Sequence, residues 1–93
     1  TAGFKSTVVR TNLSVLSEEW LGRELDKQFF NDILKLRNVD PCGEGGEYHT
    51  IVTDGPNFKS YIKLVGTQTS TSDGYGHLDI MRFEVVPKSK DNI

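Results

Sequence analysis

The alternation of apolar and polar positions predicts strands at the start of the chain and through its second half. Val8 and Val9 lie among threonines within residues 4–11, a composition typical of a β-strand. Later stretches rich in β-branched and aromatic residues, separated by turn sequences, predict further strands at 48–53, 60–69 and 77–86. We expect these last three strands to form an antiparallel meander.

A short helix is expected after the first strand. Ser17 is suited to cap its N-terminus, and Glu18 and Glu19 follow where the helix dipole favours negative charge. This helix would carry Trp20 and end at Gly22.

A second helix is predicted from helical spacing. Asp26 can cap it, and its apolar residues recur every three or four positions. These residues are Phe29, Phe30, Ile33, Leu34 and Leu36.

Turn sequences divide the remaining chain. Residues 54–56 (Asp-Gly-Pro) and 73–74 (Asp-Gly) predict reversals, while the Ser/Thr-rich residues 67–72 and the polar tail 88–93 are read as loop and terminus. In the last strand the apolar parity changes near Ile80, which indicates a β-bulge or a strand covered on both faces; the bulge is favoured.

These elements predict an α+β domain in which two helices pack on a small, mostly antiparallel sheet, in the order βααβββ. The predicted core consists of Phe4, Val8, Trp20, Phe29, Ile33, Leu34, Ile51, Ile62, Leu64, Ile80 and Phe83.

Composition indicates one soluble domain with a single core, since 93 residues are 35% hydrophobic and 26% charged. The formal net charge is −2 and the basic residues are scattered, which argues against nucleic acid as a ligand. No apolar run is long enough to span a membrane, and the first residues lack the charged and apolar regions of a signal peptide, so neither a membrane span nor a signal peptide is expected in this sequence. Cys42 is the only cysteine, so no internal disulfide can form and a cytoplasmic location is expected. The first residue is not Met, which suggests a fragment of a longer chain.

Candidate chemistry gathers in residues 42–49, where a thiol, carboxylates and an imidazole lie among glycines. Glu44, Glu47 and His49 could bind a cation, orient an amine or accept a proton. If a strand begins at Tyr48, Glu47 and His49 share a face. The alternative to a functional pair is that His49 is simply half-exposed on a strand and Glu47 is a solvated residue at its rim. One Cys and one nearby His fall short of a zinc site, and nothing local supplies a base for Cys42 as nucleophile.

Residues 39–59, which include the run Cys-Gly-Glu-Gly-Gly-Glu-Tyr-His-Thr, resemble the signature of the diphthine–ammonia ligase family, also called N-type ATP pyrophosphatases, within the adenine nucleotide alpha-hydrolase-like PP-loop superfamily. The segments 3–5 (Gly-Phe-Lys) and 20–26 (Trp-Leu-Gly-Arg-Glu-Leu-Asp) resemble the family in the same order. Arg23 could clamp a phosphate or carboxylate, or instead form a surface salt bridge with Glu19 or Asp26.

The resemblance implies a two-domain enzyme. An N-terminal PP-loop domain with a Ser-Gly-Gly-Lys-Asp sequence would bind ATP and Mg²⁺ and adenylate an acceptor carboxylate, and ammonia would displace AMP; in the best-understood branch the acceptor is diphthine on elongation factor 2. This chain lacks that sequence. Residues 1–93 therefore resemble the C-terminal, substrate-facing domain alone, with no cofactor and no activity expected by itself.

The resemblance also implies roles for individual residues. The expected catalytic residues are Glu44, Glu47 and His49, which would orient the acceptor or ammonia. The expected substrate-binding residues are Gly43, Gly45, Gly46, Tyr48, Thr50 and Arg23. No metal site is expected in this chain. The rival hypothesis is a noncatalytic α+β module that binds a protein or a metabolite through the same loop.

Overall fold

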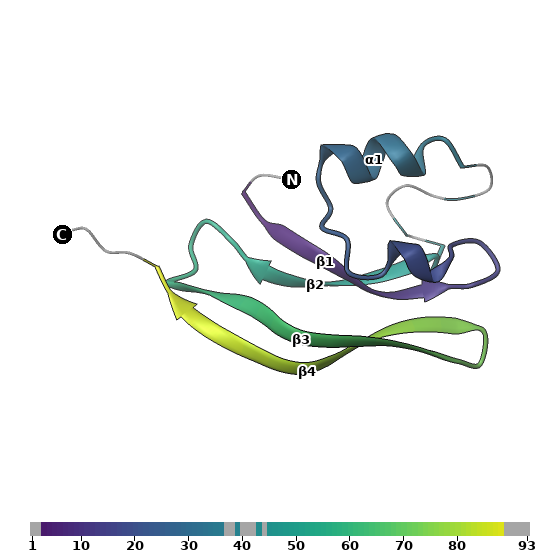
Figure 1. Cartoon of the computed structure of the whole chain (residues 1–93). Helices are drawn as coiled ribbons and strands as arrows, with labels where there is room; N and C mark the ends of the chain where they lie inside the picture. The colour runs from purple at the N-terminus through teal and green to yellow at the C-terminus, as the bar shows by residue number, and fades with distance from the viewer. Residues whose placement is uncertain (1–2, 37–38, 40–42, 44, 89–93) are drawn as a thin grey trace.

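A computed structural model describes residues 3–36, 39, 43 and 45–88 (Figure 1). Its elements are strand β1 (Lys5–Asn12), the short 3-10 helix η1 (Glu18–Trp20), helix α1 (Lys27–Ile33) and strands β2 (Tyr48–Asp54), β3 (Ser60–Ser72) and β4 (Tyr75–Pro87). The described part of the chain is therefore mostly β-structure with one α-helix packed on it.

The prediction of two helices in the order βααβββ is wrong, because the first of them is only the 3-10 turn η1. Ser17 has extended backbone, as an N-cap should, but its side chain makes no cap hydrogen bond. After Trp20 the backbone of Leu21 is extended again, and Gly22 has a left-handed φ of 85°. A turn without a side-chain cap that meets a left-handed glycine two residues later cannot lengthen into an α-helix.

Helix α1 forms where its spacing predicts it. Asp26 caps the helix, since its side chain accepts a hydrogen bond of 2.8 Å from the backbone N–H of Phe29. Phe29 and Ile33, four residues apart, are both buried. The helix ends at Ile33, so Leu34 lies beyond it with 66% of its surface exposed.

Strand β1 organises the sheet, whose order is β2-β1-β4-β3 with antiparallel pairs. The predicted meander is therefore wrong, because β1 separates β2 from the β3–β4 hairpin. Strand β4 pairs with β1 only at residues 10–12. The other half of that edge is occupied by the segment after η1: Val8 donates to the carbonyl of Arg23 (2.9 Å), and Leu25 donates to the carbonyl of Ser6 (3.0 Å).

Because this edge of β1 is shared, β4 leaves β1 and the β3–β4 hairpin runs on the side of the β1–β2 pair opposite α1 (Figure 1). At the tip of the hairpin, Asp73 and Gly74 have φ angles of 54° and 83°, as a tight hairpin turn requires. Residues 67–72, expected as a loop, belong to β3 because they pair with β4. The register passes from Thr67–Ile80 to Gly66–Arg82, which confirms the bulge near Ile80.

The core lies between α1 and the sheet. Phe29 is its centre: its ring meets those of Trp20, Phe30 and Tyr48 edge-on, with centroids 5.4, 5.1 and 5.3 Å away. The buried apolar residues are Val8, Leu16, Phe29, Ile33 and Tyr48. The core prediction was right for Val8, Phe29 and Ile33, and it missed Leu16 and Tyr48. Three further predicted residues, Trp20, Ile51 and Leu64, are only half-buried. The prediction was wrong for five residues that are exposed: Phe4, Leu34, Ile62, Ile80 and Phe83.

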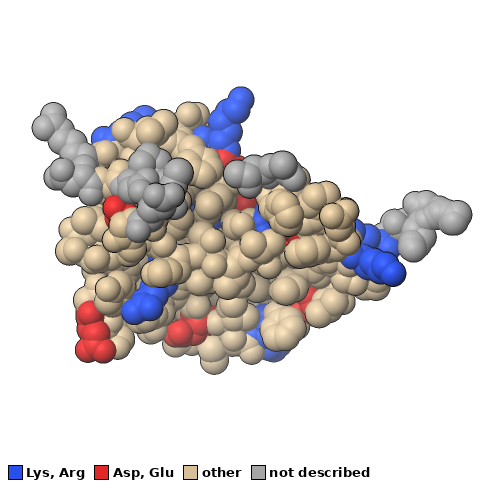
Figure 2. Space-filling model, turned by 180° about the vertical axis from the view of Figure 1, so that it is seen from behind, with Lys and Arg blue, Asp and Glu red and all other residues tan. Residues whose placement is uncertain are grey.

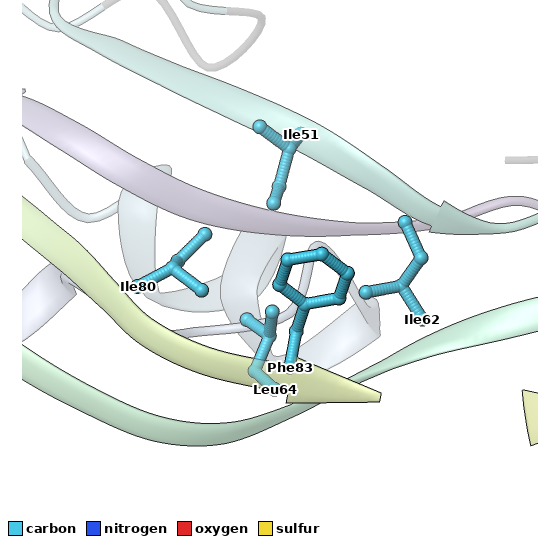
Figure 3. A pocket seen from close by; sticks show the side chains of 5 residues that line it. All are labelled: Ile51, Ile62, Leu64, Ile80 and Phe83. Carbon is cyan, nitrogen blue, oxygen red and sulfur yellow. The ribbon is translucent and has the colours of Figure 1, made fainter. Parts of the chain in front are cut away.

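Several of these misplaced residues line a cleft between β2 and the β3–β4 hairpin. In Figure 3, Ile51 points from β2 toward the hairpin side chains across from it. The cleft has a volume of about 280 Å³ and is lined by Ile51, Ile62, Leu64, Ile80 and Phe83. It stays open, since Phe83 exposes 59% of its surface. Ile80 and Phe83 are three positions apart and can line the same cleft because the bulge near Ile80 shifts the alternation of β4. Nothing in the described chain covers the cleft.

An ion pair joins the ends of the two layers. The ammonium group of Lys88 lies 2.6 Å from a carboxylate oxygen of Asp54 and donates to the carbonyl of Gly55 at 2.8 Å. The hydrogen bond from Lys88 is the main reason why the pKa of Asp54 lies below its ordinary value of 3.8. A carboxyl whose pKa is lowered by folding stabilises the folded state above its unfolded pKa, and this stabilisation is lost as the pH falls through the folded pKa.

We therefore expect Asp54→Asn to lower the free energy of unfolding at neutral pH, and this difference from the native chain to shrink as the pH falls below 3.8. Urea unfolding at a series of pH values measures the effect. Glu19→Gln, which alters an exposed carboxylate, is the control and should leave the pH dependence unchanged. A difference between native and Asp54→Asn chains that is constant with pH would contradict the stated role of Lys88.

Candidate functional site

The residues of the predicted site lie on the loop that leads into β2. We call residues 43–47 the glycine–acid loop; Glu44 of this loop, and Cys42 before it, lie outside the described residues. Gly43 and Gly46 have φ angles of 71° and 84°. The prediction that the glycines provide left-handed backbone is confirmed at these two positions.

Tyr48 fixes the loop to the core. Its side chain is 6% exposed and packs edge-on against Phe29. The backbone of Gly43 lies directly over the Tyr48 ring, because a Cβ added at Gly43 would come within 2.9 Å of the ring atom Cζ. The aromatic ring expected among the substrate contacts is thus also the anchor that determines where the loop lies.

The carboxylate of Glu47 folds back over the loop. A Cβ added at Gly45 would meet its two oxygens at 2.8 and 3.0 Å, so glycine is the residue that leaves room for this conformation. The backbone carbonyl of Glu47 accepts a hydrogen bond of 2.9 Å from the N–H of Asn12, at the end of β1. Glu47 is therefore half-buried, and its backbone is joined to the end of β1.

His49 lies on the other side of the strand. Tyr48 and Thr50 pair with the buried residues Thr11 and Val8 on the side of α1, whereas the exposed His49 points to the opposite face. Glu47 precedes the strand, whose first residue is Tyr48. The catalytic roles of Glu47 and His49 stay predictions.

Arg23 lies apart from the loop, between η1 and α1. Its guanidinium forms a salt bridge of 2.9 Å with Asp32 and lies over the rings of Trp20 and Phe29, 4.8 and 5.5 Å from their centroids. The partner is thus Asp32, not Glu19 or Asp26. The pKa of Asp32 is lowered first by a hydrogen bond from Gln28 and then by the one from Arg23. Arg23 braces the fold, and its expected contact with substrate stays a prediction.

Charged groups are dispersed over the molecule. On the face shown in Figure 2, acidic and basic side chains are spread around a surface that is mostly uncharged. Among residues 3–36, 39, 43 and 45–88, no three His, Cys, Asp or Glu side chains lie together as a metal site requires. None of the described helices is long and apolar enough to cross a membrane.

The structure adds neighbours of His49 that sequence patterns did not suggest. Arg10 of β1 is its direct cross-strand partner, and Arg10 is paired on its other side with His77 of β4. Each of these residues lies in a predicted strand. Their proximity depends on the order of the strands, which the alternation of residues within one strand does not reveal.

Comparisons with known proteins agree with the motif. The model of a protein family described as "Diphthamide synthase C-terminal domain" matches residues 1–86. A cattle protein named diphthine–ammonia ligase is 33% identical over 70 residues, covering 71% of this chain and 26% of the relative. The protein of that name from Saccharomyces cerevisiae is 29% identical over 89 residues, covering 92% of this chain and 13% of the relative. The one from Schizosaccharomyces pombe is 35% identical over 66 residues, covering 68% and 11%. The chain thus spans about a quarter or less of the length of these relatives.

The packing of Tyr48 under the loop predicts unequal effects of two alanine substitutions. Gly46→Ala should lower the free energy of unfolding by about 1 kcal/mol, because left-handed backbone is strained for alanine while open space surrounds its Cβ. Gly43→Ala adds a contact of 2.9 Å with the Tyr48 ring and should cost roughly 1 to 2 kcal/mol more. Urea unfolding of both variants measures the difference, and equal losses would show that the loop does not rest on the ring.

Proposed function

Because the chain belongs to the diphthamide synthase C-terminal domain family, we propose that it is the substrate-facing domain of an ATP-dependent amide-forming ligase that resembles diphthine–ammonia ligase. In this proposal an N-terminal PP-loop domain of the same polypeptide binds ATP and Mg²⁺ and adenylates the acceptor carboxylate. The acceptor is diphthine on elongation factor 2 if the chain shares the role for which its relatives are named. The cytoplasm is the expected location.

The observation that carries the proposal is that the glycine–acid loop contacts the core at Gly43 and the sheet at Glu47. The Tyr48 ring supports Gly43 from the core, and Asn12 binds the carbonyl of Glu47. A loop tied to the sheet at both points can present Glu47 and the peptide groups of Gly43, Gly45 and Gly46 in a constant geometry. Positioning of this kind lowers the barrier to a reaction between two bound reactants by reducing the entropy that they lose.

In the proposed reaction this domain assists a proton transfer next to the bound acceptor. The nitrogen of ammonia forms a bond to the acyl carbon of the adenylate, the bond from that carbon to the AMP oxygen breaks, and AMP leaves with the electron pair. The nitrogen must also lose one proton. Glu47, together with Glu44 and His49, is proposed to accept that proton or to orient the ammonia. Thr50 and Arg23 remain proposed contacts to the acceptor.

The open cleft supports a place beside another domain. Its five apolar side chains are uncovered in the described chain although Phe83 and Ile62 expose 59% and 37% of their surfaces. The matched region makes up 26% of the cattle relative and 13% of the yeast one, so those proteins contain ample chain to cover it. We assign the cleft to the ATP-binding domain of the same polypeptide, as the surface on which that domain packs.

The catalytic part of the proposal is tested in the polypeptide that joins this chain to its ATP-binding domain. Glu47→Ala and His49→Ala should each lower amide-forming turnover, by roughly a hundredfold for the residue that accepts the proton, while circular dichroism stays unchanged. Glu19→Ala, an exposed glutamate outside the loop, should retain full turnover.

Unchanged turnover in both loop variants would refute the catalytic assignment. The rival hypothesis of a noncatalytic binding module has its own signature. In that case the isolated chain would bind a carboxylate acceptor saturably without any ATP-binding domain, whereas the ligase hypothesis predicts little affinity for the acceptor alone. Calorimetric titration of the chain with the acceptor separates the two.

The assignment of the cleft predicts that hydrogen exchange at residues 62–64 and 80–83 is slower in the joined polypeptide than in the isolated chain. Phe83→Ser should abolish this protection by removing an apolar contact. Met81→Ser is the matched control, since Met81 lies on the same strand, is 64% exposed and does not line the cleft. Equal exchange with and without the ATP-binding domain would contradict the proposed packing.

A further inference from the structure

One row of polar side chains crosses the whole sheet on the face opposite α1. His49 of β2 pairs with Arg10 of β1, Arg10 pairs with His77 of β4, and His77 pairs with Ser70 of β3. Residues directly opposite one another on neighbouring strands share a face, with Cβ atoms about 5 Å apart. The next row, which contains the buried Thr11 and Tyr48, points to the α1 side. The sheet thus places a guanidinium between two imidazoles, with a hydroxyl beside them.

Arg10 is incompletely satisfied within the described chain. Its Nε atom is buried and has no hydrogen-bond partner there. The guanidinium lies over the ring of Tyr75, with Cζ 4.1 Å from the ring centroid, which holds the plane of the side chain in place. Arginine remains charged at any physiological pH, and a buried donor without an acceptor is costly. The arrangement calls for an acceptor with negative charge.

No carboxylate of the described residues supplies that charge. Asp79 is the acidic residue nearest along β4 on this face, two positions from His77, and it is paired across the hairpin with Gln68. Within the described ranges Arg10 forms no ion pair with Asp79 or with any other acid. His49 is exposed and Arg10 and His77 are half-buried, so the row is open to a small ligand from solution.

We propose that Arg10, His49, His77 and Ser70 form a binding site for a phosphate-type oxyanion. The guanidinium supplies charge-assisted hydrogen bonds, the imidazoles supply further N–H donors, and the Ser70 hydroxyl can donate to a remaining oxygen. A tetrahedral oxyanion presents acceptors in several directions at once, which suits donors that lie side by side on neighbouring strands. The assignment does not rest on the ligase function, because the row exists whether or not the chain acts beside an ATP-binding domain.

The test uses the 93-residue chain and inorganic phosphate at constant ionic strength, with the imidazole resonances of His49 and His77 followed by NMR. Native protein should show saturable shifts with a dissociation constant in the millimolar range. Arg10→Gln should weaken binding by roughly tenfold or more, because it removes the charge and the planar donor group together. Arg10→Lys keeps the charge and should bind with intermediate affinity.

Arg82→Gln is the matched control, since it removes the same charge from an exposed arginine elsewhere on β4, and it should bind phosphate like the native chain. If Arg10→Gln fails to fold, His77→Gln tests the same site and should also weaken binding. Three results would each overturn the proposal: no saturable shift in the native chain, equal weakening by Arg82→Gln and Arg10→Gln, or binding of acetate as tight as that of phosphate.

Discussion

The sharing of one edge of β1 between two partners determines the shape of this domain. Near its start, β1 exchanges hydrogen bonds with the segment around Arg23; near its end, it pairs with β4. A strand edge has one set of N–H and C=O groups, so β4 cannot continue beside β1 once those groups are taken. The long hairpin is therefore turned beneath the β1–β2 pair, and a sheet that could have been flat becomes two layers with a cleft between them.

The same arrangement makes the two faces of β1 and β2 different in kind. On the α1 side, Phe29 packs against Trp20, Phe30 and Tyr48. The Tyr48 ring in turn contacts Gly43 of the glycine–acid loop. The loop is thus positioned by the hydrophobic core, although its own side chains are polar. On the opposite face the apolar residues are left uncovered and the charged row is left open. The core and the support of the glycine–acid loop thus lie on one face of these strands, and the cleft and the charged row lie on the other.

Features specified by neighbouring residues were predictable from the sequence. The Asp26 cap, the Asp73–Gly74 turn, the bulge near Ile80 and the left-handed glycines of the loop depend on backbone chemistry within a few positions. Features that depend on distant segments were not. Ser17 and the acidic residues after it are consistent with a helix. However, the backbone N–H of Gly22 donates to the carbonyl of Val8 in β1, so the chain joins the sheet there instead of continuing as a helix. Likewise, the pattern at Phe83 shows an apolar face but cannot show whether that face is covered.

The bulge in β1 illustrates how one residue can decide what the site contains. Val8 and Arg10 are two positions apart, yet they pair with Thr50 and His49, which are adjacent. In a regular strand Val8 and Arg10 would share a face, and the guanidinium would enter the core beside α1. The extra residue, Val9, shifts the alternation, so that both Val8 and Thr11 are buried while Arg10 points to the other side. The Arg10 guanidinium, which would be costly to bury in the core, is thereby placed between His49 and His77. Its position follows from the backbone of β1 rather than from any attraction among the three side chains.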